Sequence, residues 1–137
     1  MKHGSGIRNF LYPLNFSGGI FMSEMVRVEI ISNLSKLNKM KRLLSQLGVS
    51  GMTVMQCMGC GIEKGTQEYE VDERVEMALI PKWLIILYVK GDMLDELINK
   101  IKKELYTGHI GDGKIFVSDL TNVIRVRTGE EGLAALD

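Results

Sequence analysis

The stretch KWLIILYV, residues 82–89, carries an apolar or aromatic side chain at every position after Lys82. A strand with one face in water alternates apolar and polar residues, whereas a strand buried on both faces does not. This stretch therefore predicts a central strand of a β-sheet, and the other elements are arranged around it.

A helix is predicted downstream of this strand. Asp92 is a suitable N-cap, and Gly108 is a suitable residue to end the helix. The apolar residues between them recur at three- and four-residue spacing and form one stripe, which consists of Leu94, Leu97, Ile98, Ile101 and Leu105. Two short segments, residues 115–117 (IFV) and 123–126 (VIRV), predict two further strands.

The region upstream predicts a strand and then a helix. Val26, Val28 and Ile30 alternate with polar residues, which is typical of a strand with one buried face. The helix is expected to begin at a cap on Ser35 and to end at Gly48. Its apolar stripe consists of Leu37, Met40, Leu43, Leu44 and Leu47.

Between these two halves, residues 49–57 predict a second strand. Residues 59–80 are glycine-rich at first and acidic later, and they predict a long loop. The full order is strand, helix, strand, strand, helix, strand, which is a doubled βαβ unit of the α+β class. Two helices cover only one face of a four-stranded sheet. The other face needs a partner, and we expect a homo-oligomer.

Composition narrows the classes of function. A chain of 137 residues has the size of one domain, and 45% apolar with 25% charged residues is ordinary for a globular protein. Seventeen basic residues balance seventeen acidic ones, which argues against nucleic-acid binding. No apolar stretch reaches the roughly 20 residues of a membrane span, so we expect no direct membrane insertion. Two cysteines and no secretory signal favour the cytoplasm.

Residues 1–21 differ from the domain that we place at residues 22–137. They show no helical or strand periodicity, and proline, asparagine and glycine residues interrupt the apolar run that a secretory signal needs. Two interpretations remain open: a mobile arm, or a start assigned upstream of a natural one at Met22. Peptide mapping of the native protein separates them, because a fragment from before Met22 excludes the second.

Residues 111–114, GDGK, predict a loop that binds an anion. Its two glycines permit positive φ angles, which turn successive N–H groups toward one point, and Lys114 adds a positive charge. Arg125 and Arg127 lie two residues apart in a predicted strand and hence on one face, as a polyphosphate site requires. The alternatives are a plain turn for the loop and surface ion pairs for the arginines. Together the two features favour a nucleotide site.

The run GDGKIFVSDLTNVIRVRTGEEGLAAL, residues 111–136, resembles the C-terminal signature of the PII family of nitrogen-regulatory signal proteins. The resemblance extends upstream through residues 51–54 (GMTV), 59–65 and 79–82 (LIPK), and it covers residues 25–136. It implies a ferredoxin-like βαββαβ sandwich with a long T-loop, assembled as a compact homotrimer. It also implies a non-catalytic protein that binds ATP or ADP in clefts between subunits and controls a target through the T-loop.

The resemblance further implies roles for individual residues. The adenosine side of the nucleotide would be held by Thr53 and Gly61. The phosphates would be cradled by Gly111, Asp112, Gly113 and Lys114. A neighbouring subunit would add Arg125 and Arg127. Lys82 would pair with a carboxylate of 2-oxoglutarate, which also chelates an Mg²⁺ ion on the triphosphate.

One departure from the family bears on the effector. Members commonly carry a glutamine that reaches both Mg²⁺ and 2-oxoglutarate, and this chain has Glu63 there, followed by Lys64. A carboxylate at this position is a suitable Mg²⁺ ligand but repels the dianionic 2-oxoglutarate. Two functions therefore remain open: a sensor of adenine nucleotides and 2-oxoglutarate, or an energy-charge sensor of the same fold without a 2-oxoglutarate response.

The T-loop departs from the family as well. The tyrosine that is uridylylated in many bacterial members falls at Val75, so we predict no uridylylation at the usual site. The acidic residues of this loop indicate either a solvated surface or a docking site for a basic partner. The expected target is an ammonium transporter, glutamine synthetase or another nitrogen regulator. The residues expected to contact it are Tyr69, Glu70, Asp72, Glu73 and Arg74.

Three other classes of protein fit less well. An enzyme needs a nucleophile or base beside the phosphate loop, and no histidine, cysteine or carboxylate pair is placed there. An RNA-binding sheet stacks bases on aromatic residues, which the first predicted strand lacks. A structural trimer with an empty cleft does not explain the cations at Lys114, Arg125 and Arg127. Cys57 and Cys60 have the spacing of a redox pair, but no helix follows them, and we interpret them as unrelated.

Overall fold

The computed structural model describes residues 24–60 and 79–137. Its main elements are β1 (Met25–Asn33), α1 (Leu37–Gln46), β2 (Thr53–Gly59), β3 (Ile80–Lys90), α2 (Leu94–Leu105), β4 (Lys114–Asp119) and the short α3 (Leu133–Leu136). Single 3-10 turns, η1 (Leu34–Lys36) and η3 (Gly91–Met93), lead into α1 and α2. This order confirms the predicted ferredoxin-like arrangement.

The four strands form one sheet in the order β2-β3-β1-β4, and every neighbouring pair is antiparallel. The run at residues 82–89 lies in β3, which pairs with β1 on one side and β2 on the other. β1 pairs with β3 along its full length, from Met25 opposite Lys90 to Asn33 opposite Lys82. The prediction of a central strand is confirmed.

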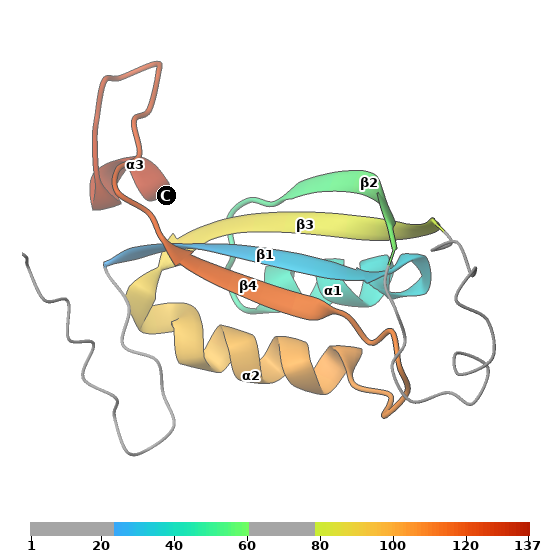
Figure 1. Cartoon of the computed structure of the whole chain (residues 1–137). Coiled ribbons are helices and arrows are strands. Elements are labelled where there is room, and N and C mark those ends of the chain that lie inside the picture. Colours follow the sequence, from blue (N-terminus) through green and yellow to red (C-terminus); the bar gives the residue numbers. More distant parts are fainter. Residues whose placement is uncertain (1–23, 61–78) are drawn as a thin grey trace, which may run out of the picture.

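The hydrophobic core lies between the sheet and the two long helices, which cover the same face (Figure 1). The predicted stripes supply most of it. The buried residues of the core are Val26, Val28 and Ile30 in β1, Ile85, Leu87 and Val89 in β3, Met40 and Leu44 in α1, and Leu94, Leu97, Ile101 and Leu105 in α2. Each such aliphatic side chain contributes about 1.5–3 kcal/mol when fully buried.

The opposite face of the sheet carries the alternate residues of each strand, and several large ones are exposed. Met55 in β2, Tyr88 in β3 and Phe116 in β4 are 45%, 43% and 48% exposed. Neither α1 nor α2 lies over this face, which we call the open face. The expectation that two helices cover one face only is therefore met.

The expected final strand at residues 123–126 is wrong. Ile124 forms a single antiparallel bridge with Glu131, and residues 125–130 between them form a turn. The Arg125 N–H donates to the Glu130 carbonyl at 2.9 Å, and the Gly129 N–H donates to the Arg125 carbonyl at 2.8 Å. A segment forms a regular strand only where another strand pairs with it along its length, and this one pairs with its own continuation at a single bridge.

The expected helix caps are also wrong. Ser35 lies inside η1, and the N-cap of α1 is Lys36. Asp92 lies inside η3, and the N-cap of α2 is Met93. Neither Lys36 nor Met93 forms a side-chain capping hydrogen bond. A 3-10 turn precedes each helix, and its backbone carbonyls are acceptors for the first N–H groups of the helix. A capping side chain is therefore not needed there. The end of α1 is as expected, because Gly48 follows the helix with a φ of +75°. No helix among the described residues has the length and hydropathy of a membrane span.

Candidate functional site

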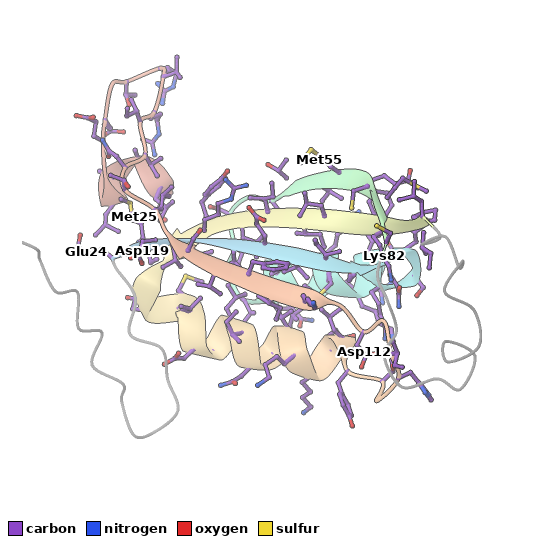
Figure 2. All side chains as sticks on the ribbon, viewed as in Figure 1. Glu24, Met25, Met55, Lys82, Asp112 and Asp119 are labelled. Atoms are coloured by element: carbon purple, nitrogen blue, oxygen red, sulfur yellow. The ribbon has the colours of Figure 1, made fainter. Side chains whose placement is uncertain are left out.

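A cleft of about 360 Å³ opens at one end of the sheet, where β1 and β4 meet the loop between α2 and β4. Its lining consists of Ile31, Lys82, His109, Gly111, Asp112, Gly113, Lys114 and Phe116. Figure 2 shows Lys82 and Asp112 together at this end of the molecule. The structure thus brings the GDGK loop together with Lys82, a residue that lies about thirty positions earlier in the chain.

Two glycines shape the loop. Gly111 and Gly113 have φ angles of +97° and +111°, in the region that other residues rarely adopt. A Cβ atom on Gly113 would lie only 2.2 Å from the carbonyl oxygen of Ile31, so the loop passes directly against β1. Positive φ angles of this kind are those that turn backbone N–H groups toward an anion.

Asp112 holds the same loop through its side chain. Its Oδ2 accepts hydrogen bonds from the N–H groups of Thr107 and Gly108 at 2.8 and 3.1 Å, and its Oδ1 accepts one from the Thr107 hydroxyl. These bonds, the Thr107 hydroxyl first among them, lower the pKa of the Asp112 carboxyl below its ordinary value. The side chain therefore ties the loop together, rather than projecting a free carboxylate toward an anion.

Lys82 brings a positive charge to the cleft. Its Nζ donates to the Oδ1 of Asn33 at 2.6 Å, across the β1–β3 pair. This acceptor is neutral, so the ammonium is held in place without being neutralised. A Cβ atom on Gly111 would lie 3.9 Å from the same Nζ, which puts this charge against the glycine loop. Lys114 adds a second ammonium group to the lining.

Thr53 and the two arginines lie elsewhere in the chain. Thr53 pairs with Ile86 at the β2 edge of the sheet, whereas β4 forms the other edge. Lys114 is the first residue of β4, and Arg125 and Arg127 follow the strand. The six extended residues of β4 span roughly 20 Å. In Figure 1 the segment after β4 stands at the end of the sheet away from the cleft. One chain therefore does not bring the arginines to its own GDGK loop.

Several predicted residues lie outside the described part of the chain. These are Gly61, Glu63 and Lys64 and the target-contact residues Tyr69, Glu70, Asp72, Glu73 and Arg74, together with residues 1–21. Among the residues that the structure describes, no group of three or more His, Cys, Asp or Glu side chains is placed to hold a metal ion. Cys57 and Cys60 are both free thiols.

Among the residues that sequence reasoning missed are one that lines the cleft and two that hold lining side chains in place. Asn33 positions Lys82, Thr107 positions Asp112, and Phe116 lines the cleft from β4. Only Phe116 could have been found from the sequence, because it is a large aromatic residue on the otherwise polar face of an alternating strand. The other two are ordinary polar residues, and their roles depend on partners that only the fold brings close.

A ferredoxin-like α+β domain with a cationic, glycine-lined cleft at the end of its sheet defines a class of small anion-binding proteins. The particular family follows from comparison with known sequences. The family model described as nitrogen regulatory protein P-II matches residues 25–130, and the chain belongs to this family. It is accordingly a nitrogen-regulatory signal protein and not an enzyme.

Relatives match over most of the chain. Nitrogen regulatory protein GlnK of Escherichia coli K12 is 42% identical over 112 residues, which are 82% of this chain and 100% of the relative. Nitrogen regulatory protein P-II of Bradyrhizobium diazoefficiens is 38% identical over the same shares.

Solved structures show the same likeness. Bacillus subtilis GlnK matches with a TM-score of 0.71 and 36% identity, over 83% of this chain and 100% of that one. The GlnK–ATP complex of the same species matches with a TM-score of 0.69 and 35% identity, over 82% and 97%. Arabidopsis thaliana PII bound to citrate matches with a TM-score of 0.65 and 33% identity, over 82% and 92%.

Proposed function

We propose that this chain acts as a cytoplasmic homotrimer that binds ATP or ADP between subunits and passes the ligand state to a target protein through the loop at residues 59–80. The observation that carries the proposal is the cleft in which Lys82, Lys114 and two glycines with positive φ come together. Two ammonium groups against a loop of this shape suit a polyphosphate.

The residues present fit a nucleotide shared between two subunits. The loop at residues 111–114 would hold the phosphates, and Thr53 with Gly61 would hold the adenosine. Because β4, which spans roughly 20 Å, separates Arg125 and Arg127 from the GDGK loop of their own chain, they would serve the cleft of a neighbour. The exposed apolar residues of the open face give the subunits a surface on which to assemble. The relative from Bacillus subtilis forms a complex with ATP.

An effector response to 2-oxoglutarate rests on Lys82. Its ammonium, held by Asn33 at 2.6 Å, is suited to pair with a carboxylate. The relative from Arabidopsis thaliana is bound to citrate, another polycarboxylate. Glu63 would supply an oxygen ligand for Mg²⁺, and Lys64 follows it. The alternative is an energy-charge sensor without a 2-oxoglutarate response. The carboxylate of Glu63 favours this alternative, because its negative charge repels the 2-oxoglutarate dianion.

The target would meet the residues Tyr69, Glu70, Asp72, Glu73 and Arg74. Their net negative charge fits a basic surface on a partner. An ammonium transporter, glutamine synthetase or another regulator of nitrogen assimilation is the class of partner that we expect. Ligands in the cleft would change which conformations of this loop are populated, since Gly59 ends β2 before the loop and Lys82 lies near the start of β3 after it.

Calorimetric titration with ATP and Mg²⁺, with and without saturating 2-oxoglutarate, tests the proposal. We expect ATP to bind, and Lys114→Gln to weaken it by roughly tenfold through loss of one charge-assisted contact. Lys100→Gln is the matched control, because Lys100 pairs with Glu96 on the exposed side of α2.

The outcomes separate the candidate functions. Tighter ATP binding with 2-oxoglutarate supports the full sensor, and indifference to it supports the energy-charge sensor. Failure of the wild-type protein to bind ATP or ADP would overturn the proposal and leave a structural trimer.

A further inference from the structure

The guanidinium of Arg125 is engaged by the end of its own chain. Its Nη1 donates to the carboxylate of Glu130, and its Nη2 donates to the carbonyl of Ala134 at 3.1 Å and to the main-chain oxygen of Asp137. Ala134 lies in α3 and Asp137 directly follows it. The side chain is only 29% exposed. These contacts make Arg125 a C-terminal cap of α3.

These contacts use part of the hydrogen-bonding capacity of Arg125. A guanidinium carries five N–H groups in one plane. Three acceptors from Glu130, Ala134 and Asp137 define the orientation of that plane and, within the described part of the chain, leave two N–H groups for a ligand. A group held in this way loses less conformational freedom when it binds.

Glu130 is itself held in place. Its Oε2 also accepts a hydrogen bond from the Thr128 hydroxyl at 3.0 Å, and its backbone carbonyl accepts the Arg125 N–H at 2.9 Å. Farther along, the Asp137 carboxylate pairs with Lys90 of β3 at 3.0 Å, which ties the chain end to the sheet. Arg125 is thus held on one side by Glu130 of the turn and on the other by the end of α3, which Asp137 ties to β3.

We propose that Glu130, with the main-chain oxygens of Ala134 and Asp137, positions Arg125 for the phosphates of a nucleotide bound in the neighbouring cleft. Glu130 would be a positioning residue, since it would act through its contact with Arg125. The inference rests on the proposed function, in which Arg125 reaches a polyphosphate.

The direction in which Glu130→Gln changes the affinity for ATP tests this role. A carboxylate next to the arginine reduces the local positive potential, so electrostatics alone predicts that removing its charge tightens the binding of a triphosphate. If Glu130 positions Arg125, the same change weakens binding, because a neutral amide oxygen holds the guanidinium less firmly than a carboxylate before the ligand arrives.

The experiment compares Glu130→Gln with Glu131→Gln in the full-length protein, by calorimetric titration with ATP and Mg²⁺. Both variants remove one negative charge, but Glu131 bonds to Asn122 at 3.0 Å and not to Arg125. We expect Glu130→Gln to weaken ATP binding by roughly two- to tenfold, the scale of one side chain left to be ordered. Glu131→Gln should bind as the wild type does.

Arg125→Lys adds a second test. Lysine keeps the charge but cannot engage three separate acceptors in one plane. It should weaken ATP binding, and combining it with Glu130→Gln should add little further loss, because both changes remove the same arrangement. Thermal unfolding and sedimentation of each variant check that fold and assembly are retained.

The outcomes are distinguishable. If the wild type binds ATP and Glu130→Gln binds equally or more tightly, the positioning role is overturned and the proposed function stands. If the two losses simply add, Glu130 does not act through Arg125. If the wild type binds no nucleotide, the proposed function fails and the phosphate role of Arg125 with it.

Discussion

At the scale of single residues, the carboxyl group of Asp112 shows how the cleft is made. It accepts hydrogen bonds from the Thr107 hydroxyl and from two backbone N–H groups, and these lower its pKa. A lowered pKa means that the folded state favours the ionised form. The stabilisation is therefore fully present above the ordinary aspartate pKa of 3.8 and is lost as the pH falls through the lowered value.

This gives a pH prediction. In an NMR titration, the amide signals of Thr107 and Gly108 should shift with a midpoint below 3.8, as Asp112 takes up its proton. In Asp112→Asn the midpoint should vanish, and ATP should bind several-fold more weakly at neutral pH because the amide offers one acceptor oxygen in place of two. A midpoint at or above 3.8 would contradict the assignment of these hydrogen bonds.

At the scale of elements, the entry into β4 depends on Gly113. Gly113→Ala combines a φ of +111° with a Cβ atom 2.2 Å from the Ile31 carbonyl, so the strand must shift away from β1. We expect a loss of at least about 1 kcal/mol in the free energy of unfolding. We also expect ATP binding to be abolished, since Lys114 follows directly. Chemical denaturation and calorimetry measure the two effects.

Gly48→Ala is the matched control for this change. Gly48 has a φ of +75°, but no atom lies within 4 Å of the Cβ that alanine would add. It should lose stability through backbone strain and still bind ATP as the wild type does. Equal ATP affinity in Gly113→Ala would show that the close approach to Ile31 does not matter for the cleft.

The elements differ in how far the sequence predicts them. Local sequence patterns were enough for β1, β3 and both helices: alternation for β1, a continuous apolar run for β3, and apolar stripes for the helices. All of these elements contribute to the same core. Such patterns failed at residues 123–126, where the described residues show only the bridge from Ile124 to Glu131 and Val126 is 97% exposed. In the site, the GDGK loop was predictable from its glycines. The bond from Lys82 to Asn33, which joins residues 49 positions apart, was not.

At the scale of the whole molecule, the open face makes a prediction about assembly. Met55 lies on this face at 45% exposure, and a charge there would have to be buried in any contact between subunits. If the proposed trimer forms through this face, Met55→Lys should shift the protein from trimer toward monomer in sedimentation equilibrium. ATP affinity should fall with it at low protein concentration, because the arginines of a neighbour are lost.

Leu34→Lys is the control for assembly. The exposed fraction of Leu34, 39%, is close to the 45% of Met55, but Leu34 lies in η1 and not on the sheet. It should remain trimeric. A trimeric Met55→Lys protein would show that the subunits meet through another surface.

The course of β4 has a consequence for mixtures of chains. In the proposed trimer each subunit would give its glycine loop to one cleft and its arginines to another, so every bound nucleotide would join two subunits. A chain damaged at Lys114 and a chain damaged at Arg127 would each form rings with three defective clefts. Rings that contain both would always include one cleft built from the two undamaged halves, so two alleles that fail alone would partly restore each other.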